Sequence, residues 1–167
     1  MRCIIDINCT NLKRSYQFFR DVVGLDTGMY VAPGRPQPIA NGSLGDALRN
    51  ADGSDYTGAE MEFAANLLVP RHDWRNPIDL LEWSLPRPYG RAYESPRNLG
   101  ISRIALEVDD INAAQRKLAT ATNGAVSAVE SWDMGEFGQK KIAIFRDPDG
   151  VLLELIEQPQ PAASGLD

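Results

Sequence analysis

One stretch decides the fold of this chain: FRDPDGVLLELIE, residues 145–157. Asp-Pro-Asp-Gly at 147–150 favours a tight turn, because proline presets φ, aspartate side chains accept bonds from nearby backbone, and glycine tolerates positive φ. Apolar runs on both sides predict a hairpin. Its second strand carries one carboxylate, Glu154, among apolar residues. We expect that carboxylate to have a partner or a function, because an isolated buried charge is costly.

A second stretch repeats this strand: NPIDLLEW at 76–83 is similar to PDGVLLEL at 148–155. Both place a glutamate, Glu82 or Glu154, after two leucines. The similarity predicts an internal duplication. Each half is then predicted to contain a strand, a helix and three further strands. The expected strands are 2–10, 25–31, 60–69, 78–84, 101–108, 126–132, 140–146 and 151–157. A helix is expected at 12–23, capped by Thr10 or Asn11, and a second helix is expected to be capped by Asp109 or Asp110 and to end at Asn123-Gly124.

The domain organisation expected from this pattern is two modules joined by a linker. The first module is 1–85, with an inserted loop at 32–58; the linker is 86–98, the second module is 99–157 and a flexible tail is 158–167. Proline and glycine are frequent in the insertion and apolar periodicity is absent. Because long loops of this kind are often functional, we expect the insertion to close over a ligand.

Composition limits the classes of partner. Of the 167 residues, 43% are hydrophobic and 24% are charged, and the formal net charge is −6. An acidic chain is a poor match to nucleic acid, whose phosphates need clustered lysine and arginine. The charge suits a neutral or cationic small ligand, or serves only solubility. No apolar run is long enough to span a membrane and no signal-peptide pattern is present, so we expect a cytoplasmic protein.

Three motifs occur in order along a chain whose two halves repeat one pattern. Together they resemble the vicinal oxygen chelate superfamily of glyoxalase I, extradiol dioxygenases, methylmalonyl-CoA epimerase and bleomycin-resistance proteins. They are NLKRSYQFF at 11–19 followed by Gly24-Leu25, IALEVDD at 104–110, and DPDG at 147–150 followed by Glu154. The resemblance covers residues 2–157. It implies an α+β fold in which two tandem βαβββ modules form an open, cupped, mixed sheet, with helices on the back and the ligand in the concavity.

In metal-dependent members of this superfamily, the first and last strands of each module supply the ligands of one divalent ion. The resemblance carries those positions to Ile4, Glu82, Arg103 and Glu154. Isoleucine cannot coordinate and arginine stays protonated. We therefore expect a member with a degenerate metal site, no metal and no other cofactor. The single histidine, His72, lies in a predicted turn and is expected at the surface.

Strand alternation predicts which side chains face the ligand. Glu82, Arg103 and Glu154 are the catalytic candidates and are expected to meet in one cavity. Glu82 is expected to share its face with Ile78 and Leu80, whereas Trp83 should face the helices. The predicted ligand-binding residues are Ile4, Asp6, Asn8, Ser84, Glu107, Tyr30 and Tyr56.

Two functions remain open. One is a metal-independent isomerase, lyase or cyclase acting on a carbonyl-containing secondary metabolite, in which Arg103 holds an oxyanion and Glu82 or Glu154 is the base. The other is a non-catalytic protein that sequesters a drug or metabolite, as bleomycin-resistance proteins do, with Arg103 and a glutamate paired in place of the metal. Either way the expected partner is a small molecule, with neither nucleic acid nor membrane, and the chain is expected to form a homodimer because an unpaired module edge favours association.

Overall fold

The computed structural model of the chain describes residues 3–32, 37–38, 60–70, 74–85 and 87–157. The chain forms two compact units, residues 1–20 with 24–90 and residues 21–23 with 91–167. Most of the predicted insertion, together with Tyr56, His72 and the predicted tail, lies outside the described residues. The predicted module boundaries stay a prediction.

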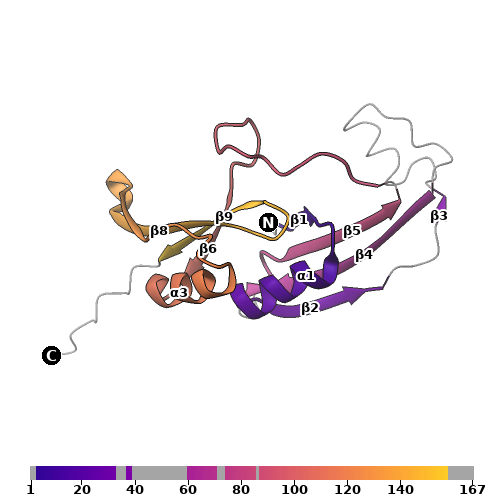
Figure 1. Cartoon of the computed structure of the whole chain (residues 1–167), viewed down its shortest axis with the longest axis horizontal. Coiled ribbons are helices and arrows are strands. Elements are labelled where there is room, and N and C mark those ends of the chain that lie inside the picture. Colours follow the sequence, from indigo (N-terminus) through magenta and orange to yellow (C-terminus); the bar gives the residue numbers. More distant parts are fainter. Residues whose placement is uncertain (1–2, 33–36, 39–59, 71–73, 86, 158–167) are drawn as a thin grey trace. The chain divides into compact units, whose positions relative to one another are not determined.

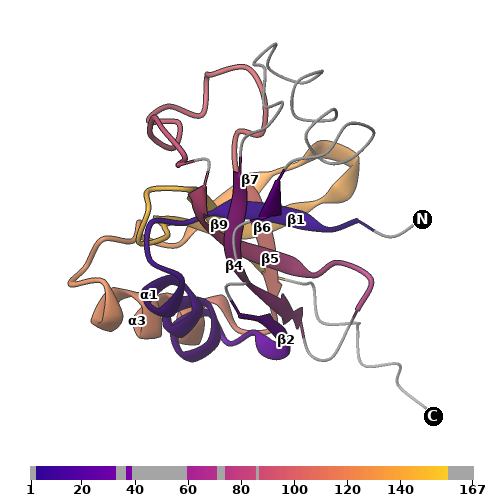
Figure 2. The ribbon, with the colours of Figure 1, turned by 90° about the vertical axis from the view of Figure 1, so that its right-hand side faces the viewer.

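The first unit contains a mixed sheet in the order β1-β5-β4-β2, to which a short strand β3 is added on β4. β1 pairs with β5 in parallel, and the other pairs are antiparallel. Figure 1 shows α1 beside this sheet, and Figure 2 shows β1, β5 and β4 after a quarter turn. The strands are β1 (Ile5–Asn8), β2 (Asp26–Val31), β3 (Gln37–Pro38), β4 (Glu60–Val69) and β5 (Ile78–Leu85).

The second unit repeats the plan with the order β6-β9-β8-β7. β6 and β9 are parallel, and the remaining pairs are antiparallel. When the short β3 is left aside, each unit has four strands. The first lies beside the last, and the third and then the second follow. The predicted fold class, α+β with two tandem βαβββ modules, is confirmed. The strands are β6 (Ile104–Val108), β7 (Glu130–Asp133), β8 (Gln139–Arg146) and β9 (Leu152–Glu157).

Within the described residues, each unit has one α-helix, and a side chain caps its start. α1 (Leu12–Gln17) begins where Asn11 Oδ1 accepts a bond from the Arg14 N–H at 2.9 Å. α3 (Ile111–Ala121) begins where Asp110 Oδ1 accepts from the Ala113 N–H, also at 2.9 Å. Such caps satisfy backbone donors that have no partner within the helix. Both predicted helix starts are confirmed.

The ends of the helices differ from a simple α-helix. α1 continues as a π-helical turn, Phe18–Val23, which ends at Gly24 with φ of 98°. A residue with a side chain is strained at that angle, and glycine is not. A short 3₁₀ turn, Gly135–Phe137, precedes β8. None of the described helices is long and apolar enough to cross a membrane.

The core of each unit lies between its helix and one face of its sheet, which we call the helix face. In the first unit Phe19, Leu68 and Leu80 are completely buried. In the second unit Leu118 and Leu153 are buried equally well. Burial of one such side chain stabilises the folded state by roughly 1.5–3 kcal/mol. We call the opposite face of each sheet its open face.

The β8–β9 hairpin forms at the predicted turn. Asp147 Oδ1 accepts from the backbone N–H groups of Asp149 at 2.9 Å and Val151 at 2.8 Å, and Gly150 has φ of 91°. Arg146 Nη1 donates to the Gly150 carbonyl at 2.6 Å. These bonds fix the direction in which β9 leaves the turn.

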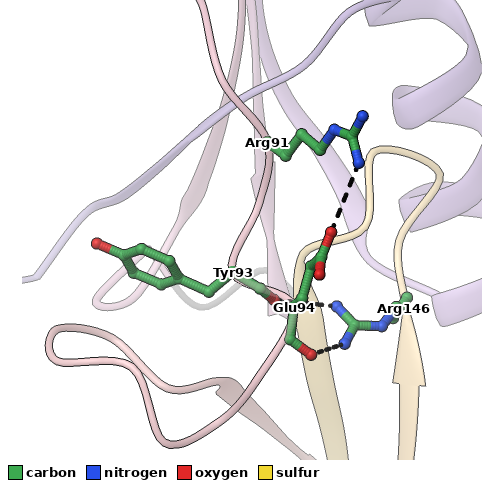
Figure 3. Close-up of polar contacts among 4 residues, drawn as sticks. All are labelled: Arg91, Tyr93, Glu94 and Arg146. Carbon is green, nitrogen blue, oxygen red and sulfur yellow. Dashed lines mark hydrogen bonds and ion pairs between the residues drawn. The ribbon is translucent and has the colours of Figure 1, made fainter.

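Arg146 also holds the segment that precedes the second sheet. Its Nη1 donates to the Tyr93 carbonyl at 3.2 Å and its Nη2 to the Glu94 carbonyl at 2.8 Å (Figure 3). The Glu94 side chain pairs with Arg91 at 3.6 Å. The predicted linker is therefore tied to the hairpin at residues 93 and 94.

One predicted strand begins late. The second strand of the second module was expected at 126–132, and β7 begins only at Glu130. Val126 makes an isolated bridge to Phe145, and Ser127 Oγ accepts from the Ile144 N–H at 2.9 Å. A side-chain acceptor at Ser127 takes the place of a regular ladder bond, so the strand starts after it.

We predict that Asp147→Ala lowers the free energy of unfolding by about 1–3 kcal/mol, because two backbone donors lose their acceptor. Asp147→Asn keeps an oxygen at this position and should cost less than half as much in urea unfolding. An asparagine variant as unstable as the alanine variant would contradict this role for Asp147.

The pH dependence of the same variants has a defined sign. Burial raises the pKa of Asp147 above its ordinary 3.8 and outweighs the backbone bonds that lower it. The folded state therefore binds this proton more tightly than the unfolded chain, and the resulting stability is lost as pH rises through the folded-state pKa. Asp147→Asn has no such loss, so its stability relative to the wild type should improve as pH rises from 3.8 toward neutrality.

Candidate functional site

A carboxylate on the last strand of each module contacts the start of that module's helix. Glu82 Oε2 accepts from the Leu12 N–H at 2.7 Å. Glu157 Oε1 accepts from the Ile111 N–H at 3.3 Å. Lys141, and then this backbone donor, hold the pKa of Glu157 below its usual value. Glu82 and Glu157 are thus equivalent in the duplication, and both lie on a helix face.

The predicted face of Glu82 is therefore wrong. β1 pairs with β5 so that Ile7 lies opposite Leu80 and Asp6 opposite Asp79. Partners in a sheet point to the same side and successive residues alternate. Leu80 and Glu82 consequently share the helix face with Ile7. The acid that lies beside Asp6 on the open face is Asp79, not Glu82 as the Leu-Leu-Glu similarity had predicted.

The predicted face of Trp83 is wrong for the same reason. Trp83 was expected to face the helices, but it lies on the open face, where its Nε1 donates to Asn8 Oδ1 at 3.1 Å. Its ring is 4.9 Å from that of Phe63, the opposite residue on β4. Asn8, a predicted ligand-binding residue, thus accepts a hydrogen bond from this indole.

In the second unit the predicted faces agree with the structure. Ala105 on β6 lies opposite Glu154 on β9, and Glu107 lies two residues further along the same open face. Arg103, directly before β6, donates from Nε to Glu154 Oε2 and forms an ion pair with it. The Glu154 side chain is 2% exposed and that of Arg103 is 31% exposed. The guanidinium covers a buried carboxylate and keeps one side toward solvent.

An aromatic ring and aliphatic side chains surround this pair. The Arg103 guanidinium lies 5.8 Å from the centre of the Trp132 ring, and the Trp132 residue is 41% exposed. Ile144 lies opposite Glu154 on the neighbouring strand. The open face of the second unit is therefore a half-buried apolar surface with one charged pair and one indole. Its half-buried aliphatic residues are Ile142, Ile144, Leu152 and Ile156.

The open face of the first unit carries two neighbouring carboxylates, Asp6 and Asp79. Burial raises the pKa of Asp79, and the negative charge of Asp6 raises it further. Ile4, which precedes β1, is 58% exposed. Asp79 was not among the predicted site residues, although burial beside a like charge is typical of functional carboxylates.

The sequence contained a signal for Asp79. IDLLE at 78–82 and LELIE at 153–157 both read apolar, acidic, apolar, apolar, acidic. This alignment pairs Asp79 with Glu154 and Glu82 with Glu157, as the strand registers do. The shorter Leu-Leu-Glu similarity is offset from it by three residues.

Glu82 lies instead with two predicted ligand-binding residues, Ser84 and Tyr30. All three line a pocket of about 620 Å³ between α1 and the helix face of the first sheet. Ser84 Oγ donates to Glu62 Oε2 at 2.6 Å in the same pocket. Because Glu82 belongs to the first unit and Arg103 to the second, the predicted meeting of Glu82 with Arg103 and Glu154 stays a prediction.

The donor atoms at these positions do not fit the divalent ion of metal-dependent relatives. The second unit offers Glu154, whose carboxylate is paired with a guanidinium, and Arg103, which cannot coordinate. The first unit offers Asp79 and Ile4. Among the described residues, no three of the types His, Cys, Asp and Glu gather where they could hold a metal ion.

The family model described as Glyoxalase/Bleomycin resistance protein/Dioxygenase superfamily matches residues 4–155. The chain belongs to this superfamily. The duplicated βαβββ units agree with that membership. No curated protein sequence matches the chain.

Solved structures of this superfamily share the fold. A glyoxalase family protein from Bacillus cereus is 17% identical, with a TM-score of 0.63, over 96% of this chain and 95% of that one. TnmS3, an antibiotic binding protein from Streptomyces sp. CB03234, is 18% identical, with a TM-score of 0.57, over 95% of this chain and 96% of that one. A glyoxylase/bleomycin resistance protein/dioxygenase domain from Frankia sp. EAN1pec is 15% identical, with a TM-score of 0.55, over 96% and 93%. At these identities the similarity shows the fold alone.

We predict that Arg103→Met lowers the free energy of unfolding by about 2–3 kcal/mol, because it leaves the Glu154 carboxylate buried and unpaired. This is below the roughly 3–5 kcal/mol of a fully buried pair, since water reaches part of Arg103. Arg103→Met combined with Glu154→Leu should recover most of the loss in urea unfolding.

Lys141→Met is the matched control, because it removes the cation of a more exposed pair, Lys141 with Glu157 at 2.7 Å. It should cost much less than Arg103→Met, because solvent screens this more exposed pair. A double variant no more stable than Arg103→Met would show that Arg103 does not act by neutralising Glu154.

Proposed function

We propose that this protein binds and sequesters a small molecule, without a metal ion, on the open face of its second unit. The observation that carries the proposal is the ion pair of Arg103 with the buried Glu154, at the position where metal-dependent relatives hold their ion. The Arg103 guanidinium occupies Glu154 Oε2, and the Glu154 side chain is 2% exposed, so this carboxylate is not open to a substrate. The pair is better suited to binding than to moving protons.

The chemistry of this face specifies the ligand class. Glu154 takes the Nε side of the Arg103 guanidinium, which leaves its Nη groups as donors for a carbonyl or acidic oxygen. The exposed Trp132 ring offers a stacking surface, and the aliphatic residues around it favour an apolar body. We propose a flat, mainly apolar molecule with one carbonyl or acidic oxygen, such as a polyketide-like secondary metabolite or antibiotic.

The superfamily supports a binding role. One protein of the same fold is described as an antibiotic binding protein. The low identity to that protein does not transfer its ligand to this chain. It supports the proposal only by showing that this fold accommodates such a role.

A second candidate function, metal-independent isomerase or lyase chemistry, is favoured by Asp79. Burial and the neighbouring Asp6 raise the pKa of Asp79, which moves a carboxylate toward the range of a useful general base. Glu82 and Glu154, the predicted bases, are instead held by the Leu12 N–H and by Arg103. If the protein is an enzyme, we propose Asp79 as its base.

Homodimerisation is part of the proposal. The edge strand β7 is exposed along its whole length, and such edges favour association. Light scattering that gives the mass of one chain at micromolar concentration would contradict it.

We predict that anthraquinone-2-carboxylate, a flat carbonyl-bearing acid, quenches tryptophan fluorescence on binding. Trp132→Leu should weaken its affinity about three- to tenfold, in line with roughly 0.5–1.5 kcal/mol for a stacked pair. Trp74→Leu removes an indole of the first unit and serves as the matched control, with affinity unchanged. Equal weakening by both substitutions would contradict the assigned face.

The two functions are separated with a probe that has a proton next to its carbonyl, such as 2-tetralone. In D₂O, mass spectrometry should show exchange of that proton no faster than in buffer if the protein only sequesters. Exchange that the protein accelerates, with the acceleration abolished by Asp79→Asn, would replace the binding proposal with the enzymatic one.

A further inference from the structure

The pocket on the helix face of the first unit is separate from the open face of the same unit. Asp6 and Asp79 point to the opposite side of that sheet, as the β1–β5 register requires. The pocket is bounded by α1 on one side and by β2, β4 and β5 on the other, and its volume is about 620 Å³. That is large enough for a small organic molecule.

A buried acceptor without a partner lines this pocket. Asn66 is 6% exposed, and its Oδ1 makes no hydrogen bond within the part of the chain that the structure describes. It lies on β4 between Leu80 on β5 and Tyr30 on β2. A buried acceptor left unsatisfied costs folding free energy, so a donor supplied by a ligand is strongly favoured at this position.

The other polar groups of the pocket require the same kind of ligand. Glu82 and Glu62 bring two carboxylates, and each already receives one donor, from the Leu12 N–H and from Ser84 Oγ respectively. An ionised carboxylate can accept several bonds, so both retain acceptor capacity. Lys13 is the one cationic residue among the described lining residues. Among the lining residues that the structure describes, two negative charges against one positive charge favour a cation.

Aromatic side chains complete the pocket. Tyr16 on α1 and Tyr30 on β2 both line it. The guanidinium of Arg20 lies 4.9 Å from the centre of the Tyr16 ring and stacks on it. Tyr30 offers a second aromatic surface and is mostly exposed.

We propose that this pocket is a second ligand site, which binds an organic ammonium compound with an apolar or aromatic body. The ammonium donates to Asn66 Oδ1 and to the Glu82 carboxylate, and the body lies against the tyrosines. The site does not depend on the proposed function of the open face, since it uses a different face and ligands of opposite charge.

The test is calorimetric titration of the full chain with phenethylamine, with 2-phenylethanol as the neutral analogue and 3-phenylpropionate as the anionic one. Phenethylamine should bind at least about tenfold more tightly than the alcohol, a difference of about 1.4 kcal/mol, and the acid should not bind. Equal binding of the amine and the alcohol would show that the pocket does not recognise the ammonium group, and it would overturn the proposal. Failure of the amine to bind at millimolar concentration would mean that water alone satisfies Asn66 and would also overturn it.

Variants locate the amine. Glu82→Gln keeps an acceptor for the Leu12 N–H and should weaken phenethylamine about tenfold. Glu157→Gln, the equivalent change at the second helix start, is the matched control and should leave its affinity unchanged. Unchanged affinity in Glu82→Gln, or equal weakening by Glu157→Gln, would overturn the assignment.

Asn66 is tested in both directions. Asn66→Leu should weaken phenethylamine about tenfold without lowering the thermal midpoint, because it removes an unsatisfied acceptor. Asn66→Asp adds a charge and should strengthen binding, which keeps the test decisive if the leucine variant does not fold. Phenethylamine affinity that is insensitive to Asn66→Asp, or that is lost in Arg103→Met, would place the amine elsewhere and contradict the proposal.

Discussion

The hydrogen bond from the first N–H of each helix to a carboxylate on the last strand is the constraint on which both modules depend. In the first unit it joins Leu12 to Glu82, and in the second it joins Ile111 to Glu157. Because each donor is one of the backbone groups that a helix cannot satisfy internally, the carboxylate fixes both the helix start and the register of the strand. The other acid of each strand, three residues earlier, must then point to the open face.

That register gives each sheet two chemically different faces. The helix faces hold the apolar cores, with Leu80 and Leu153 fully buried. The open faces hold Asp79 beside Asp6 in one unit and Glu154 beside Arg103 in the other. The acids meet opposite conditions, because burial and then a neighbouring carboxylate raise the pKa of Asp79, whereas Glu154 is paired with a guanidinium. The two copies of the last strand thus differ in the residue beside the open-face acid, which is Asp6 in the first unit and Arg103 in the second.

The fold could be predicted from the sequence because its local signals agree. A capping residue was expected at 10 or 11 and at 109 or 110, and the caps are Asn11 and Asp110. The Asp147 turn and the alternating strands likewise predict the elements that form. The membership that these motifs indicated is confirmed over residues 4–155. Agreement of local signals with the global pattern is what makes a fold readable from sequence.

The site could be predicted only in part. Alternation placed Arg103 and Glu154 on one face, because Ile104, Leu106 and Val108 alternate with Ala105 and Glu107 on β6. The parallel pairing of Ala105 with Glu154 then agrees with that face. Alternation failed for Glu82, because β5 has apolar residues on both faces and two acids that fit either register equally well. Only the pairing with β1 and the bond to Leu12 decide between them. The unsatisfied Asn66 could not be predicted, since its burial depends on three strands and a helix that meet only in the folded unit.

We propose that Arg103 takes the place of the metal ion that metal-dependent members of the superfamily bind. The most direct test is the metal content of the protein purified without chelator and then dialysed against Zn²⁺, Mn²⁺ and Mg²⁺. A guanidinium paired with Glu154, and no histidine at the corresponding positions, leaves too few ligands for a tight site. We predict far less than one equivalent of any of these ions per chain. A stoichiometric ion that is lost in Glu154→Gln but retained in Glu157→Gln would contradict it.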